Sequence, residues 1–110
     1  MLSNWIKIGS FGVDSGQVLI TDPCYLDSWK GHNFDEEAIK KMQEEGKFEY
    51  SYSGASARTL IDLSDKQHGA GDIGNGFGVV SGTGYGDGSY PVYAKFNEEG
   101  RVMQLKIDFN

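Results

Sequence analysis

The segment GYGDGSYPVY, residues 84–93, combines three glycines with an aspartate and three tyrosines. Glycine N–H groups without side-chain cover can form a concave nest for an anion, and tyrosine rings beside them can stack on an aromatic ligand. The same letters also suit a purely structural role, because Asp-Gly is a favoured pair at the centre of a type I′ turn that leads into a strand. Two interpretations therefore stay open: a hairpin turn, or the rim of a binding pocket.

A second possible reactive group involves Cys24, the one cysteine of the chain. Paired with His32 or His68, Cys24 would form a thiolate–imidazole couple suited to nucleophilic catalysis, although a lone cysteine at a strand end is usually a small buried group. One cysteine excludes an internal disulfide and favours a reducing compartment. One cysteine and two distant histidines cannot assemble a structural zinc site.

Three aspartates beside predicted turns, Asp14, Asp22 and Asp87, could form a carboxylate pair or a divalent-cation site. Aspartate in a turn more often accepts hydrogen bonds from the nearby backbone. The segment GAGDIG, 69–74, matches the spacing of a dinucleotide-binding loop, but neither the preceding strand nor the following helix is predicted. We therefore predict neither a metal nor a cofactor.

The elements that must position these residues are those of a mixed fold. Asn33 or Asp35 can cap a helix over 35–45 that Gly46 would end. Alternating or apolar runs predict strands, and the glycine-rich stretch 69–89 predicts loops at one end of the sheet. The predicted strands cover 5–13, 17–20, 48–53, 58–63, 77–81, 90–96 and 101–109, the last two as a hairpin. The fold class that we predict is α+β: a mainly antiparallel twisted sheet or half-barrel with one amphipathic helix packed on it.

Length and charge restrict the possible partners. The 110 residues predict a single domain, 1–110. A net charge of −6 disfavours nucleic acid and anionic membranes as partners. No apolar run approaches the roughly 20 residues of a membrane span, and the first residues lack the apolar region of a signal peptide. We expect a cytoplasmic protein, in a bacterium or an infected bacterial host.

Two stretches, VDSGQVLITDPCYL at 13–26 and GYGDGSYPVYAKFNEEGRVMQLKIDF at 84–109, together resemble a family of uncharacterised bacterial and phage proteins. Its members read V-D-[SA]-G, then D-P-C-Y, and end with G-D-G-x-Y-P-V and I-D-F. The resemblance implies one compact, mainly β domain of bacterial or phage origin. It also implies that the motif residues cluster in space, namely Asp14, Gly16, Asp22, Cys24, Tyr25, Asp87, Gly88 and Tyr90.

Three functions follow as hypotheses. The first is a non-catalytic small-molecule binder, which by the resemblance would be a phage protein with an anti-defence role that sequesters a nucleotide-derived host signal. Tyrosine or tryptophan would stack on a base, while glycine amides and Arg58 would hold phosphates. The ligand-binding residues that we predict are Asp22, Cys24, Tyr25, Trp29, Arg58, Tyr85, Gly86, Asp87, Gly88 and Tyr90.

The second function is a protein–protein interaction module, such as a host-takeover inhibitor or an accessory protein, because acidic charge and exposed tyrosines suit a binding surface. The third is a small hydrolase that uses Cys24 or the aspartates. A homodimer or a higher homo-oligomer is expected, since an open sheet leaves an edge strand to cover.

Overall fold

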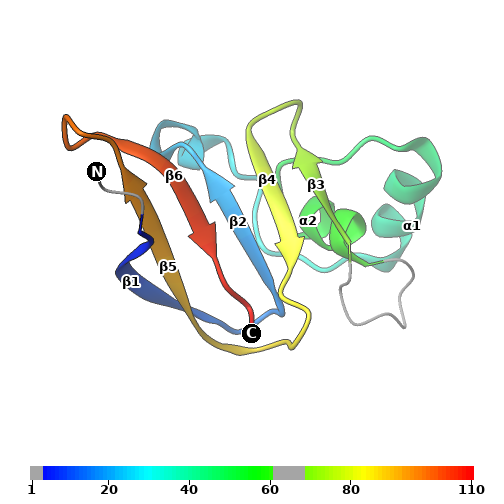
Figure 1. The fold of residues 1–110 in the computed structure, drawn as a ribbon. Helices are drawn as coiled ribbons and strands as arrows, with labels where there is room; N and C mark the ends of the chain where they lie inside the picture. Colours follow the sequence, from blue (N-terminus) through cyan, green and yellow to red (C-terminus); the bar gives the residue numbers. More distant parts are fainter. Residues whose placement is uncertain (1–3, 61–68) are drawn as a thin grey trace.

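The computed structural model describes residues 4–60 and 69–110, which form two three-stranded antiparallel sheets and a group of helices. Figure 1 shows the two sheets side by side, with the helices behind the second sheet. The predicted fold class, an α+β protein with antiparallel sheet and helix packing, is confirmed. Sequence alternation defines which side chains share a face but not which strands are partners, and so it did not reveal two separate sheets.

The first sheet has the order β1–β5–β6, with β1 at Ile6–Val13, β5 at Gly88–Phe96 and β6 at Val102–Ile107. The predicted C-terminal hairpin is β5–β6, and its turn is held by Asn97, whose Oδ1 accepts the N–H groups of Glu99 and Arg101 at 2.9 Å each. β1 is one strand with an irregularity between Lys7 and Gly9. The middle strand of this sheet therefore pairs with the start of the chain on one side and with its end on the other.

The second sheet has the order β2–β4–β3, with β2 at Gln17–Thr21, β4 at Gly78–Gly82 and β3 at Ala70–Ile73. The prediction that 69–89 forms loops is wrong for β3 and for the first residues of β5, whereas the strand predicted at 77–81 is confirmed as β4. The glycines instead permit close packing: a Cβ at Gly78 would lie 2.8 Å from Leu19 Cδ1. Two further glycines, Gly74 and Gly76, are explained by the β3–β4 turn, in which they and Asn75 all have positive φ.

The predicted helix over 35–45 is α1, Glu36–Glu45. Asp35 caps its start by accepting the N–H groups of Glu37 and Ala38, at 3.1 and 3.2 Å, and Gly46 ends it with φ 69°. A short 3₁₀ helix, η1, covers Pro23–Ser28.

A second helix, α2 at Tyr52–Thr59, replaces the strands predicted at 48–53 and at the start of 58–63; residues 61–63 lie outside the described chain. Ser51 caps this helix through a hydrogen bond from Gly54 N to Ser51 Oγ at 2.9 Å. The small residues of YSGASART give no apolar helical stripe, yet they let α2 approach its neighbours closely. α2 lies against β3 and β4, and α1 packs on α2.

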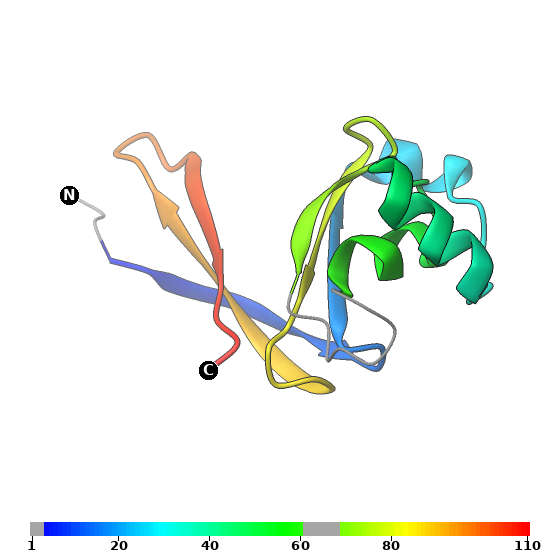
Figure 2. The same ribbon diagram turned by 90° about the vertical axis from the view of Figure 1, so that its right-hand side faces the viewer.

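The hydrophobic core lies between α2 and the β2–β4–β3 sheet. It contains Tyr50, Ala55, Ile73 and Val80, with Leu19, Trp29 and Phe48 packed around them. Figure 2 shows the helices on one side of this sheet and the β1–β5–β6 sheet diverging from its other side. The chain measures 51 × 28 × 20 Å, and none of the described helices is both long and apolar enough to cross a membrane.

Candidate functional site

The GYGDG loop ties the two sheets together. It connects β4 to β5, and the β1–β2 turn at 14–16 makes the other connection beside it. Asp87 Oδ1 accepts the Gly16 N–H at 2.9 Å, and the Gly16 carbonyl accepts the Thr83 N–H at 3.0 Å. Within the loop, the Gly86 carbonyl accepts hydrogen bonds from Thr83 Oγ1 at 2.6 Å and from the Tyr90 hydroxyl at 2.7 Å. The anion that a glycine amide binds here is thus the chain's own Asp87 carboxylate.

This geometry corrects the turn predicted at Asp87–Gly88. A type I′ turn requires positive φ at both central residues, and Asp87 has no positive φ. The strands on either side, β4 and β5, also belong to different sheets, so the loop is not a hairpin. Of the predicted ligand-binding residues here, Tyr85 is left with an exposed side chain, whereas Tyr90 is buried.

Replacing Asp87 tests its role in joining the sheets. Asp87→Ala leaves the half-buried Gly16 N–H without its acceptor, and we expect it to lower the free energy of unfolding by about 1–3 kcal/mol. Asp87→Asn keeps a carbonyl oxygen at the same place and should recover most of that loss. Urea unfolding followed by circular dichroism measures both. Equal destabilisation by Asn and Ala would contradict this account and indicate a role for the charge itself.

The DPCY motif begins the 3₁₀ helix η1. Asp22 Oδ1 accepts the Cys24 N–H at 2.9 Å, and the Asp22 carbonyl accepts the Tyr25 N–H at 2.9 Å. Pro23 follows the cap at the first helical positions, where its missing N–H costs nothing. The motif therefore has a sufficient local structural explanation. Strand β2 separates it from the Asp87 loop, so the eight motif residues lie in two groups rather than one.

Aromatic rings continue from η1 into the core. Tyr25 stacks on Phe77 with ring centroids 4.6 Å apart and planes 11° from parallel. The Phe77 and Trp29 rings each meet Tyr50 edge to face, at 5.5 and 5.0 Å. The row of rings therefore runs from the exposed Tyr25 to the buried Tyr50 and ends at Trp29, the fourth residue predicted near this motif, which is partly buried.

The arrangements predicted for catalysis find little geometric support. Cys24 is an exposed free cysteine. The His32 ring lies beside the Trp29 ring, with centroids 6.0 Å apart, and His68 lies outside the described residues. Asp22 and Asp87 are engaged by backbone N–H groups at opposite ends of β2. Across 4–60 and 69–110, no group of three or more His, Cys, Asp or Glu residues converges as metal ligands would.

Arg58 joins α2 to the edge strand β3. Its Nη2 lies 3.6 Å from Asp72 Oδ1, and its guanidinium carbon lies 4.7 Å from the centre of the Phe48 ring. A Cβ at Gly71 would overlap this guanidinium group, which would then have to move aside. The phosphate-binding cation predicted from the sequence is thus already paired and packed in the structure.

A partly open cavity of about 220 Å³, here called the aromatic cavity, lies between β2 and the helices. Its walls include three aromatic or imidazole rings, contributed by Trp29, His32 and Tyr52, and the polar side chains of Ser15 and Gln17. The remaining lining residues are apolar: Val18, Leu19, Ala55 and Val80. None of the nine carries a carboxylate, a lysine or an arginine. Small-molecule sites commonly have such walls, mostly apolar and aromatic with a few placed polar groups.

Two observations bear on the polar groups near this cavity. Gln17 is oriented by α2, because its Nε2 donates to Ser56 Oγ and its Oε1 accepts from Thr59 Oγ1, each at 3.4 Å. The indole N–H of Trp29 is buried and has no hydrogen-bond partner among the described residues. Buried donors without acceptors are rare in native proteins, and each one calls for an explanation.

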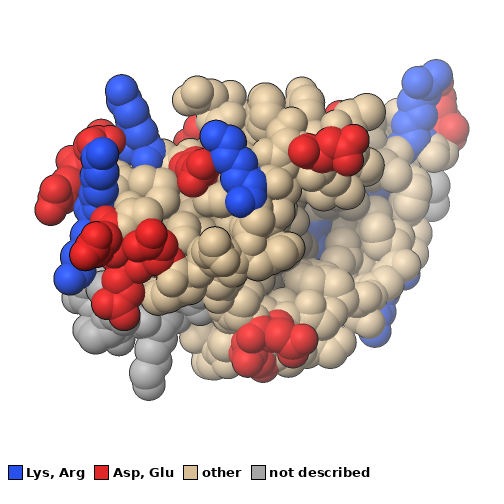
Figure 3. Space-filling view, turned by 180° about the vertical axis from the view of Figure 1, so that it is seen from behind, with Lys and Arg blue, Asp and Glu red and all other residues tan. Residues whose placement is uncertain are grey.

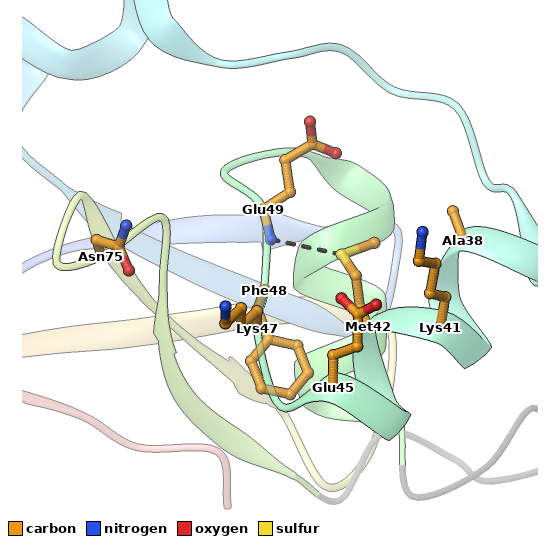
Figure 4. Close-up of a pocket in the computed structure, with 8 residues that line it drawn as sticks. All are labelled: Ala38, Lys41, Met42, Glu45, Lys47, Phe48, Glu49 and Asn75. Atoms are coloured by element: carbon orange, nitrogen blue, oxygen red, sulfur yellow. Dashed lines mark hydrogen bonds between the residues drawn. The ribbon is translucent and has the colours of Figure 1, made fainter.

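A larger but open groove, about 590 Å³, lies between α1 and the β3–β4 turn. Figure 4 shows Met42 and Phe48 at its centre, with the Glu49 N–H directed at Met42 Sδ, 3.4 Å away, and Asn75 on the opposite wall. Lys41, Glu45 and Lys47 line its rim. Mixed charges around this groove define no ligand chemistry, so the aromatic cavity is the better candidate site.

Comparison with known proteins gives one result. Residues 7–107 match the model of a family described as protein of unknown function (DUF4241). The chain belongs to this family. The match covers the first motif segment, the second one up to residue 107, and also the middle of the DUF4241 chain, for which the sequence offered no resemblance. No curated protein and no solved structure matches it.

Of the residues that line the aromatic cavity of this DUF4241 protein, only Trp29 was among the predicted ligand-binding residues. Gln17 was missed because it reads as the polar residue of a short strand. Tyr52 was assigned to a strand that does not exist. His32 was considered only as a partner of Cys24. The other nine predicted residues do not line this cavity.

Proposed function

We propose that this DUF4241 protein is a non-catalytic binding protein whose ligand is an uncharged, ring-shaped small molecule of nucleobase or nucleoside type. The observation that carries the proposal is the aromatic cavity between β2 and the helices, lined by Trp29, His32 and Tyr52 and without any carboxylate, lysine or arginine. Aromatic rings offer a planar ligand both stacking and edge contacts. The cavity volume of about 220 Å³ suits one ring system with small substituents.

The polar groups of the cavity give the ligand an orientation. Gln17 presents both an amide donor and an acceptor, and its two hydrogen bonds to α2 hold it in place before the ligand arrives. Such pre-organised groups reduce the entropy lost on binding. An acceptor on the ligand also gives the buried Trp29 N–H a partner after a small local adjustment.

Charge narrows the ligand class. The chain carries a net charge of −6, and the guanidinium of Arg58 is occupied by Asp72 and Phe48. A phosphate inside the cavity would have no cation to pair with, and a buried unpaired charge is costly. The proposed ligand therefore keeps the base of the nucleotide-derived signal expected from sequence, while any phosphate stays outside the cavity. Sequestration of a host signal by a phage protein remains the biological role that we propose, on the resemblance stated above.

The test is a thermal-shift screen of the full chain with nucleobases, nucleosides and nucleotides, followed by calorimetry on the hits. A ligand at 100 times its Kd should stabilise the fold by about 2.7 kcal/mol. His32→Ala should weaken binding at least tenfold with little effect on stability, since the His32 side chain is exposed. Asn33→Ala, a neighbouring change that does not touch the cavity, is the matched control. A screen without any shift, together with native protein that carries no extra mass, would contradict the proposal.

A further inference from the structure

The two sheets enclose a second, different concavity, here called the apolar groove. It measures about 300 Å³ and lies on the side of the β2–β4–β3 sheet that faces away from the helices. Its walls are Val18 and Ile20 of β2, Val92 of β5, Leu105 and Ile107 of β6, and Phe109, with Ser81 as a polar member. The register explains the arrangement, because Val92 pairs with Ile107 and Ala94 with Leu105, so these side chains share one face of the first sheet.

The apolar groove is exposed rather than filled. Leu105 is 63 % exposed and Ile20 is 57 % exposed. Val79 of β4 and Met103 of β6, large apolar residues on strands that border the groove, are also exposed. Figure 3 shows a hollow between the two halves of the molecule with mostly uncharged walls, whereas charged residues of both signs gather over the helical half. Contiguous apolar surface of this kind marks an interaction site.

The surface area indicates how large the missing partner is. The chain exposes 7307 Å², whereas a folded monomer of its 12.1 kDa mass exposes about 6,000 Å². The excess of about 1,300 Å² exceeds the roughly 800 Å² that each partner buries in a standard interface. The radius of gyration, 15.4 Å, is likewise larger than the roughly 13 Å expected for a compact chain of this length.

We propose that a second copy of this chain covers the apolar groove, with the two β1–β5–β6 sheets packed face to face about a two-fold axis. A two-fold interface brings the same patch of both copies together, and an uncharged apolar face can meet its own copy without repulsion, even though each chain carries a net charge of −6. Sheets packed face to face lie about 10 Å apart with interlocking side chains, which the protruding Leu105 and Met103 of β6 supply.

The experiment is light scattering coupled to size exclusion, together with native mass spectrometry, on the full chain at micromolar concentration. Wild-type protein should have twice the 12.1-kDa chain mass. Leu105→Lys places an unpaired charge in the interface and should weaken dimerisation by about 100-fold or more. Gln104→Lys introduces the same charge on the opposite face of β6 and should leave the dimer intact. Circular dichroism should show both variants folded, because Leu105 and Gln104 are both exposed in the single chain.

Three results would overturn the proposal. The first is a wild-type monomer at these concentrations. The second is a dimer that Leu105→Lys does not weaken. The third is a monomer that carries a non-protein mass which Leu105→Lys removes, because the groove would then hold a small apolar ligand. The cavity of the proposed function does not include Leu105, so loss of the dimer and loss of nucleoside binding are separate outcomes.

Discussion

Gly54→Ala is expected to destabilise the fold by about 3 kcal/mol or more, or to prevent folding, because it forces a side chain into the backbone. Gly54 lies in the first turn of α2, and the chain at Glu49 crosses directly over it. An added Cβ would overlap the Glu49 carbonyl oxygen and lie 2.6 Å from its carbon and 2.8 Å from its nitrogen. These are backbone atoms that cannot rotate away as a flexible side chain would.

The measurement is thermal and urea unfolding of Gly54→Ala beside Gly12→Ala. Gly12 lies in β1 without positive φ, and a Cβ there would meet no atom within 4 Å, so its replacement should change stability by less than about 0.5 kcal/mol. The melting temperature of Gly54→Ala should fall by about 10 °C or more. If both variants have the melting temperature of the wild type, the chain at Glu49 does not pass as close to Gly54 as described.

Ile39→Ala is expected to cost about 2–5 kcal/mol, the range for removing a fully buried aliphatic side chain and leaving a cavity. Ile39 is 0 % exposed and is the buried residue of α1. It fixes α1 on α2, and α2 in turn covers the core between helix and sheet. The cost should appear as a lower urea midpoint and as faster hydrogen exchange in α1.

Ile8→Ala provides a matched deletion of the same atoms at an exposed site. Ile8 is 54 % exposed and lies at the irregularity of β1, so its truncation should cost less than about 1 kcal/mol. Equal losses for the two variants would mean that α1 is not packed as described.

The parts of the fold that the sequence predicted are those with a strong local signal. Helix α1 has an aspartate cap, an apolar face and a terminal glycine, and all three operate in the structure. The β5–β6 hairpin has two clean alternations around a polar turn. Helix α2 has a serine cap at Ser51 but no apolar face. Its small residues instead permit close packing: a Cβ at Gly54 would overlap the Glu49 backbone, and Ala55 lies in the hydrophobic core.

The candidate site was harder to predict for the same reason. Asp22 and Asp87 have the composition of functional residues, yet each satisfies a nearby backbone N–H. The walls of the aromatic cavity come from the β1–β2 turn, β2, the segment after η1, α2 and β4, and single residues such as Gln17 and His32 carry no local pattern. Tyr52 joins Gln17 and His32 in the cavity wall because it lies at the start of helix α2. The alternating pattern of 48–53 predicted a strand there instead.

The strand order β1–β5–β6 has a consequence for how the chain is synthesised. β1 is made first, but its partner β5 begins only at Gly88, after the whole helical half with its own sheet has been made. Pairing over such a long separation is slow, and an unpaired strand edge invites association with other chains. On the ribosome the helical half can assemble from residues that are already available. The apolar strand β1 that precedes it stays unprotected until β5 has left the exit tunnel.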